Sequence, residues 1–208
     1  MKIGISLTGV SYSTTGKQRD FRKTCDNFYD TLYDPLAVSH TVPVYTTTYP
    51  HELQDELLET YQPTKSQFIP FAGSYPRSTF MHGLCLVEDE ALDILICTRF
   101  DIHFNQKIID LNVDYEKFNF LFKEKVTWDS NKFVCDNFFV IPFKYLYSLA
   151  DAIENLQSDG LYPPHTFMHH IYDYIVTEVG EKNVHFIAGD EQGFSHDNRF
   201  YKLVRTEV

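Results

Sequence analysis

The segment DILICTRFDIHF, residues 93–104, closes an apolar run with three side chains that could bind a charged ligand: Arg99, Asp101 and His103. They stand at alternate positions, so they share one face if an extended strand continues through them. Carboxylate oxygen and imidazole nitrogen suit Mn²⁺ or a similar divalent ion, and a guanidinium group can hold a diphosphate through two hydrogen bonds. The pattern therefore predicts a site for a phosphate-bearing ligand, with Asp101 and His103 as metal ligands. A solvated surface loop is the alternative.

Asp136 is the second candidate, because it interrupts the otherwise apolar stretch VCDNFFVIP. A carboxylate in such a setting is costly unless it is hydrogen-bonded or has a function. It could remove the proton from a hydroxyl group that attacks a substrate, or it could be tied to backbone amides or to an arginine. Asp190 and Glu191, in the glycine-flanked stretch AGDEQG, compete for the role of base.

Two further groups could do chemistry or could be structural. His165, His169 and Asp173 are spaced four apart on a predicted helix and would share a face, which suits either a metal or solvent. Trp128 follows a cluster of aromatic residues that could stack on a sugar or pack in the core.

Strand and helix patterns alternate along the chain, which predicts an α/β domain with a central, mostly parallel sheet flanked by helices. Ligands of such sheets bind beyond the carboxyl ends of the strands, so the end of the run at 93–104 is the expected site. The predicted strands are 2–10, 40–49, 66–71, 93–104, 132–142 and 183–188, and the predicted helices are 19–36, 51–61, 74–87, 143–157 and 166–180.

The overall composition limits the classes of partner. The chain has 208 residues, enough for one domain over 1–208, and a formal charge of −11, which argues against nucleic acid or an anionic membrane. No apolar run is long enough to span a bilayer, and the amino-terminal stretch is interpreted as a strand rather than an export signal. Four scattered cysteines without a CxxC pair predict buried free thiols and a reducing compartment such as the cytoplasm.

The hydrophobic strand followed by RFDIHF resembles the DxD region of GT-A fold glycosyltransferases, in which an acidic residue at a strand end meets the metal that bridges two phosphates. In one alignment Asp101 matches the second acid and Arg99 takes the place of the first; in the other Asp101 is the first acid and His103 replaces the second. Both alignments depart from the plain motif. Arg99 could instead neutralise the diphosphate directly.

The resemblance extends to other stretches. KIGISLTGV is similar to the first nucleotide-binding strand of these enzymes, which places Thr8 and Gly9 near the base and ribose, and YPRSTFMHGL resembles the helix before the motif, where Arg77 would face the diphosphate. Together with FVCDNFFVIP and NRFYKLVR, these stretches look like the small glycosyltransferase domains of large algal DNA viruses, which decorate capsid glycoproteins.

The resemblance implies a GT-A-like domain whose amino-terminal part binds the nucleotide sugar and whose carboxyl-terminal part faces the acceptor. It implies transfer from a nucleotide-diphosphate sugar, UDP-sugar first, to a glycan or glycoprotein hydroxyl, assisted by Mn²⁺ or Mg²⁺, in the host cytoplasm if the protein is viral. Asp136 or Asp190 would be the base. A metal-dependent hydrolase or oxygenase using Asp101 and His103, or a non-catalytic nucleotide-sugar-binding module, stays open as an alternative.

Overall fold

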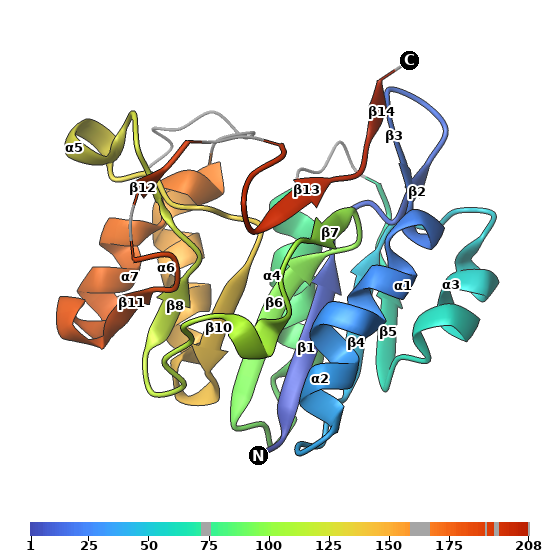
Figure 1. Ribbon diagram of the computed structural model, residues 1–208, viewed down its shortest axis with the longest axis horizontal. Helices are drawn as coiled ribbons and strands as arrows, with labels where there is room; N and C mark the ends of the chain where they lie inside the picture. Colours follow the sequence, from blue (N-terminus) through green and yellow to red (C-terminus); the bar gives the residue numbers. More distant parts are fainter. Residues whose placement is uncertain (72–75, 159–166, 190, 194–195, 208) are drawn as a thin grey trace.

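A computed structural model describes residues 1–71, 76–158, 167–189, 191–193 and 196–207. Its centre is a sheet of seven strands with helices on both faces (Figure 1), which confirms the predicted α/β class. β10 runs antiparallel to both of its neighbours, and the other six strands share one direction. In spatial order the strands are β11 (Val184–Phe186), β8 (Phe118–Phe120), β10 (Phe139–Pro142), β6 (Ile94–Arg99), β1 (Ile3–Thr8), β4 (Val44–Thr48) and β5 (Lys65–Phe68).

Alternate side chains of the central strands build two cores, one on each face of the sheet. Ile3 and Ile5 of β1 contribute to the first core, and Leu95 and Cys97 of β6 contribute to the second. Each fully buried aliphatic side chain contributes about 1.5–3 kcal/mol, so the two layers hold the strand ends firmly in place. The first face is covered by α1 (Cys25–Phe28), η2 (Tyr29–Tyr33), α2 (Asp34–Ala37) and α3 (Gln54–Tyr61), and the second by α4 (Pro76–Val87), α6 (Leu146–Ser158) and α7 (Tyr172–Val179).

The helix predicted over 19–36 is interrupted. Its first residues form β3 (Lys17–Asp20), which pairs with β2 (Tyr12–Ser13) and with β14 (Thr206–Glu207), and η1 (Phe21–Lys23) precedes α1. The π-helical turn η2 separates α1 from α2. Pro35 explains this wider turn, because proline has no N–H to donate to the preceding turn of an α-helix.

The strand predicted over 93–104 is also broken, and this break matters most for the site. β6 ends at Arg99, and after a turn the chain enters β7 (Ile102–Phe104), which pairs with β13 (Tyr201–Leu203) in a separate two-stranded sheet. Phe100 in the turn is 1% exposed and belongs to the first core. The chain therefore bends at Phe100, because the ring of this residue packs in the core.

Other differences affect single segments. Of the strand predicted over 132–142 only β10 forms, and the region predicted as the helix 166–180 contains η5 (Phe167–His170) before α7. The region 105–131, between two of the predicted strands, contains β8, which was not predicted. The remaining elements are η3 (Ile108–Asp110), β9 (Lys123–Glu124), α5 (Trp128–Asn131), η4 (Phe143–Tyr145), η6 (Glu181–Asn183) and β12 (Glu191–Gln192).

All four cysteines are free. Cys97 and Cys135 are buried as predicted, but the prediction was wrong for Cys25, which is half-buried, and for Cys85, which is exposed. Cys85 lies on α4, whose other side packs on the sheet through Leu84. Among the described residues, the model contains no helix with the length and apolar character needed to cross a membrane.

Candidate functional site

Several polar side chains meet at the edge of the sheet where the parallel strands end. β1 ends at Thr8 and β6 at Arg99, and these two residues are register partners. Since β10 runs the opposite way, the residues that precede it arrive at the same edge. The Thr98 hydroxyl donates to the Asn137 carbonyl oxygen at 3.2 Å, and the Thr8 hydroxyl lies 3.4 Å from the Thr98 carbonyl oxygen. This is the edge at which ligands of α/β sheets bind.

Three arginines converge on the Asp101 carboxylate at this edge. Arg99 Nε donates to Oδ1 at 2.9 Å, and Arg99 Nη2 lies 3.2 Å from Oδ2. Arg19 Nε and Arg205 Nε donate to Oδ2 at 3.1 Å and 2.6 Å. The Asp101 side chain is 2% exposed, so it faces the guanidinium groups rather than solvent. Asp101 is therefore a negative charge at the centre of a cluster of three arginines, which we call the arginine cluster.

The cluster has a surplus of positive charge. The three guanidinium groups outnumber the carboxylates of Asp101 and the neighbouring Asp136, so the site keeps a net positive charge in a chain of formal charge −11. The side chains of Arg19, Arg99 and Arg205 are 18%, 15% and 13% exposed, so each keeps some access to solvent while Asp101 keeps almost none. A partly desolvated group of this kind attracts an anion more strongly than surface arginines do.

Burial and charge pairing set the protonation of this cluster. Burial by itself raises the pKa of Asp101, but Arg99 and Arg205 outweigh it and hold that pKa below its ordinary value. Burial lowers the pKa of Arg19; Asp101 opposes this shift, and the neighbouring guanidinium groups of Arg205 and Arg99 add to it. Asp101 is therefore ionised at neutral pH, as its partners require.

Asp136, the predicted base, lies next to this cluster in the bend before β10. Its charge acts on Arg99. Its Oδ1 lies 3.7 Å from His169 Nδ1, which also contacts the Val134 carbonyl oxygen at 2.9 Å. A carbonyl oxygen can only accept, so Nδ1 carries the proton in this contact. The Asp136 side chain is 18% exposed and can be reached by a ligand.

Asn137 and Tyr201 form the buried side of the same region. The Asn137 amide donates to the Tyr201 hydroxyl at 2.9 Å, and Cys135 Sγ lies 3.6 Å from the same oxygen. Burial raises the pKa of Tyr201 far above its ordinary value, so its hydroxyl stays protonated. Through this contact β13, near the carboxyl end of the chain, is attached to the segment that carries Asp136.

The other predicted site residues do not belong to the arginine cluster or lie outside the described residues. His103 lies on β7 with an exposed side chain, 3.5 Å from the Asn27 amide nitrogen. Gly9 follows β1 with φ of +100°, a conformation that favours glycine. The Arg77 side chain, Asp190 and His165 lie outside the described residues, as does the side chain of Glu191, and for them the predictions stay predictions.

The environment of Asp101 does not fit a divalent cation. Both carboxylate oxygens already accept hydrogen bonds from guanidinium groups, and a metal ion would be placed against three positive charges. Within the described residues, no cluster of three or more histidine, cysteine or acidic side chains could hold a metal. Mn²⁺ at Asp101 and His103 stays a prediction.

A second polar group at this edge looks like a catalytic pair but is not one. Ser11 Oγ lies 2.9 Å from His51 Nε2, and the Leu53 backbone N–H donates to His51 Nδ1 at 3.1 Å. Since Nδ1 accepts, Nε2 of the neutral ring carries the proton and donates to Ser11. Burial lowers the pKa of His51, which favours this neutral form. The ring therefore cannot take the serine proton.

Sequence reasoning missed Arg19, Arg205, Asn137 and Gly83. Arg19 lies in the stretch predicted as a helix, and Arg205 ends the stretch NRFYKLVR, to whose residues no role was assigned. Gly83 of α4 packs on the strand ends: a Cβ there would lie 2.8 Å from Thr8 Cγ2 and 3.1 Å from Ser6 Oγ. Trp128, which could have lined an acceptor site, instead packs at ring distances of 4.9 Å on Tyr172 and 5.4 Å on Phe186.

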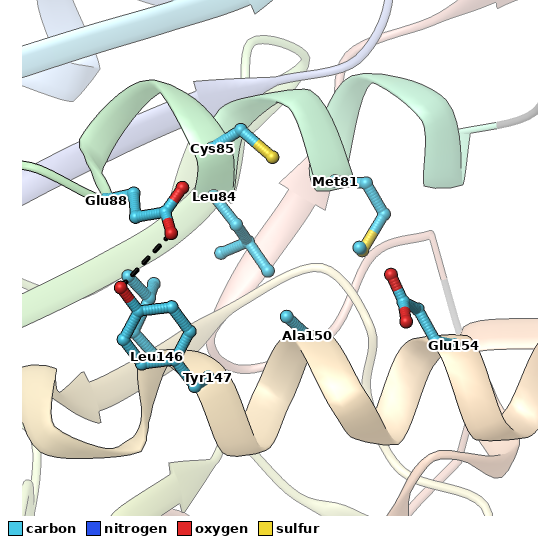
Figure 2. Close-up of a pocket in the computed structure, with 8 residues that line it drawn as sticks. All are labelled: Met81, Leu84, Cys85, Glu88, Leu146, Tyr147, Ala150 and Glu154. Atoms are coloured by element: carbon cyan, nitrogen blue, oxygen red, sulfur yellow. Dashed lines mark hydrogen bonds between the residues drawn. The ribbon is translucent and has the colours of Figure 1, made fainter.

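An apolar groove between α4 and α6 is separate from these polar groups (Figure 2). Leu84 and Cys85 come from α4, and Leu146 and Ala150 from α6. The Tyr147 hydroxyl donates to Glu88 at 3.1 Å across it. None of the arginines of the cluster lines this groove.

Comparison with protein-family models gives no match for this chain, and comparison with curated proteins gives none either.

Proposed function

We propose that the protein is a glycosyltransferase that moves a sugar from a nucleotide-diphosphate sugar, UDP-sugar first, to a hydroxyl group of a glycan. The single observation that carries this proposal is the convergence of Arg19, Arg99 and Arg205 on Asp101 at the carboxyl end of β6. A departing diphosphate needs its negative charge stabilised, and pre-positioned guanidinium groups can do this. In this proposal Asp101 positions the arginines and the arginines meet the diphosphate.

The donor would lie along the strand ends. Thr8, which ends β1 beside β6, and Gly9, which follows it, would contact the nucleoside. The diphosphate would lie at the arginine cluster, where the excess positive charge offsets the repulsion expected from a chain of charge −11. Arg77 is proposed as a further diphosphate contact on the basis of the motif resemblance alone.

Asp136 is proposed as the base of an inverting transfer. The acceptor hydroxyl oxygen forms a bond to the anomeric carbon, the bond from that carbon to the diphosphate oxygen breaks, and the hydroxyl proton passes to the Asp136 carboxylate. The diphosphate leaves as an anion toward the arginines. The position of Asp136 supports this role, since its side chain is 18% exposed and its charge acts on Arg99 of the cluster.

The acceptor is proposed to be a glycan or glycoprotein, and the compartment to be the cytoplasm. Four free thiols support a reducing compartment. The likeness of the motif stretches to viral capsid-decorating domains supports the acceptor class.

The test is a thermal-shift panel of nucleotide-diphosphate sugars, each with and without Mn²⁺, followed by a transfer assay with the donor that binds. A ligand that binds only the folded state, present at a concentration of one hundred times its Kd, stabilises the protein by about 2.7 kcal/mol. This raises the melting temperature measurably. We expect one donor to stabilise the protein without Mn²⁺. If no donor raises the melting temperature, either with or without Mn²⁺, the proposal is wrong.

Variants at the cluster make the test specific. Arg19→Gln and Arg205→Gln should each weaken donor binding about tenfold to a hundredfold, because a hydrogen bond to a charged group contributes about 1.5–3 kcal/mol. Arg22→Gln is the matched control, since Arg22 is 44% exposed and pairs with Asp20 instead. Donor binding without transfer or donor hydrolysis would identify a non-catalytic binding module.

A further inference from the structure

A cavity lies at the end of the sheet where the parallel strands begin, near the amino end of β4. Its volume is about 450 Å³, within the usual range for small-molecule sites. Val44 begins β4, whereas the arginine cluster lies where the parallel strands end, so the two sites are on different edges. The cavity is lined by Tyr29, Tyr33, Val42, Val44, Thr60, Tyr61, Gln62 and Thr64.

Three tyrosine rings shape this cavity. Tyr61 is 2% exposed and belongs to the first core, so its ring is fixed. Tyr29 stacks on it with centroids 6.5 Å apart and an interplanar angle of 20°, and Tyr33 meets Tyr29 edge-on at 5.3 Å. The Tyr29 hydroxyl donates to the Thr60 carbonyl oxygen at 2.7 Å, which ties η2 to the end of α3. The rings are held in place before any ligand arrives.

Two unusual backbone conformations flank the cavity. Tyr29 and Tyr33 are the first and last residues of the π-helical turn η2, and such turns are frequent at functional sites. Gln62 has φ of +42°, a left-handed conformation that is strained for a residue other than glycine. Both features bring side chains of the wall to the same cavity.

The chemistry of the wall selects the kind of ligand. None of the eight lining residues has a formal charge at neutral pH, although the chain is strongly acidic. The nearby charge that acts on Tyr29 is the carboxylate of Asp34, which disfavours a phosphate or another anion. The wall offers ring faces together with hydroxyl and amide groups from Tyr33, Thr60, Gln62 and Thr64.

We propose that this cavity binds a neutral saccharide, with a sugar ring against the tyrosine faces and its hydroxyl groups on the threonine and glutamine side chains. The proposal goes beyond the proposed function, because it concerns a second site and requires no nucleotide. A nucleoside also offers a flat face and several polar groups, so uridine is the competing ligand in the test.

The test uses the full chain with specifically labelled tyrosines and a titration with neutral mono- and disaccharides (glucose, galactose, N-acetylglucosamine and their β-linked dimers) followed by NMR. We expect signals of Tyr29 and Tyr33 to shift with saturation at millimolar concentrations. Tyr33→Ala should weaken binding about tenfold, which corresponds to 1.4 kcal/mol. Gln62→Gly should also weaken it, without adding backbone strain.

Tyr147→Ala is the control, because Tyr147 is 61% exposed on α6 and lies outside this cavity. It should leave saccharide binding unchanged. The proposal is overturned if no saccharide moves the signals of the cavity tyrosines, if Tyr33→Ala binds as the parent does, or if uridine or phosphate binds there in preference to sugars. These outcomes are independent of the donor panel, which contains nucleotides and reports on the other edge.

Discussion

Arg205 Nε lies 2.6 Å from Asp101 Oδ2, although 104 positions separate the two residues. This contact joins the carboxyl-terminal segment to the turn after β6. The backbone reinforces it, because the Val204 N–H donates to the Asp101 carbonyl oxygen at 2.8 Å. The end of the chain is thus part of the candidate site, and the stability of that site depends on both segments.

Asp101→Asn should strongly destabilise the protein. The change leaves three partly buried guanidinium groups without their counter-charge, and loss of one partner of a buried pair costs about 3–5 kcal/mol. Urea unfolding measures this loss. Asp173→Asn, which removes an exposed partner of Lys132, should cost less than about 1 kcal/mol.

If Asp101→Asn does not fold, the double variant Asp101→Asn with Arg205→Gln should recover part of the stability, since it removes one repelling charge. Equal stability of Asp101→Asn and the parent would show that the carboxylate does not hold the cluster together.

Asp136→Asn should lower kcat for sugar transfer by about 10²–10⁴-fold, the usual contribution of a general base. The amide has a similar shape but cannot accept the proton, so donor binding in the thermal-shift assay should stay within about twofold, or about 0.4 kcal/mol. Asp129→Asn, a change in α5, serves as the control. Parental turnover in Asp136→Asn would move the role of base to another residue, with Asp190 and Glu191 next to be tested.

Gly83→Ala should destabilise the protein, although alanine is normally the better helix former. The added methyl group would lie 2.8 Å from Thr8 Cγ2, so α4 must shift away from the strand ends. Overpacking of this kind costs about 1–3 kcal/mol in urea unfolding. Gly193→Ala meets nothing within 4 Å and should have little effect. A stabilised Gly83→Ala variant would mean that α4 does not approach β1 this closely.

Glu90 should stabilise the fold at neutral pH, and this contribution should be lost as the solution becomes acidic. Hydrogen bonds from Lys65 and Lys2 lower its pKa to about 2, against about 4.3 for an unfolded chain. A carboxyl whose pKa is lowered by folding stabilises fully above its unfolded pKa, and that contribution is lost as the pH falls through the folded pKa. The difference in unfolding free energy between the parent and Glu90→Gln should therefore be constant above about pH 5 and shrink between about pH 4.5 and 2. A difference that is the same at pH 3 as at pH 7 would contradict the assignment.

The sequence predicted the elements whose signal is local. The apolar run before Arg99 and the alternation of strands and helices led to an α/β sheet, and Arg99 lies where β6 ends, as predicted. The prediction of one strand through residue 104 was wrong, because the chain bends where Phe100 packs in the core. The periodicity of the sequence does not indicate such a bend. The helix predicted over 19–36 was wrong only in its first part, because residues 19 and 20 belong to β3, which pairs with β14 near the other end of the chain.

Residue type and order alone determined that an arginine and a carboxylate follow a buried strand at the ligand-binding edge of a sheet. Only the tertiary structure decided which groups surround that carboxylate. Arg19 lies 82 positions before Asp101 and Arg205 lies 104 positions after it, and both reach the same oxygen. Contacts over such separations depend on how the layers pack and where the carboxyl-terminal strands pair, and neither leaves a local pattern in the chain. Packing thus places Asp101 at the centre of a positively charged cluster, an arrangement that the sequence did not predict.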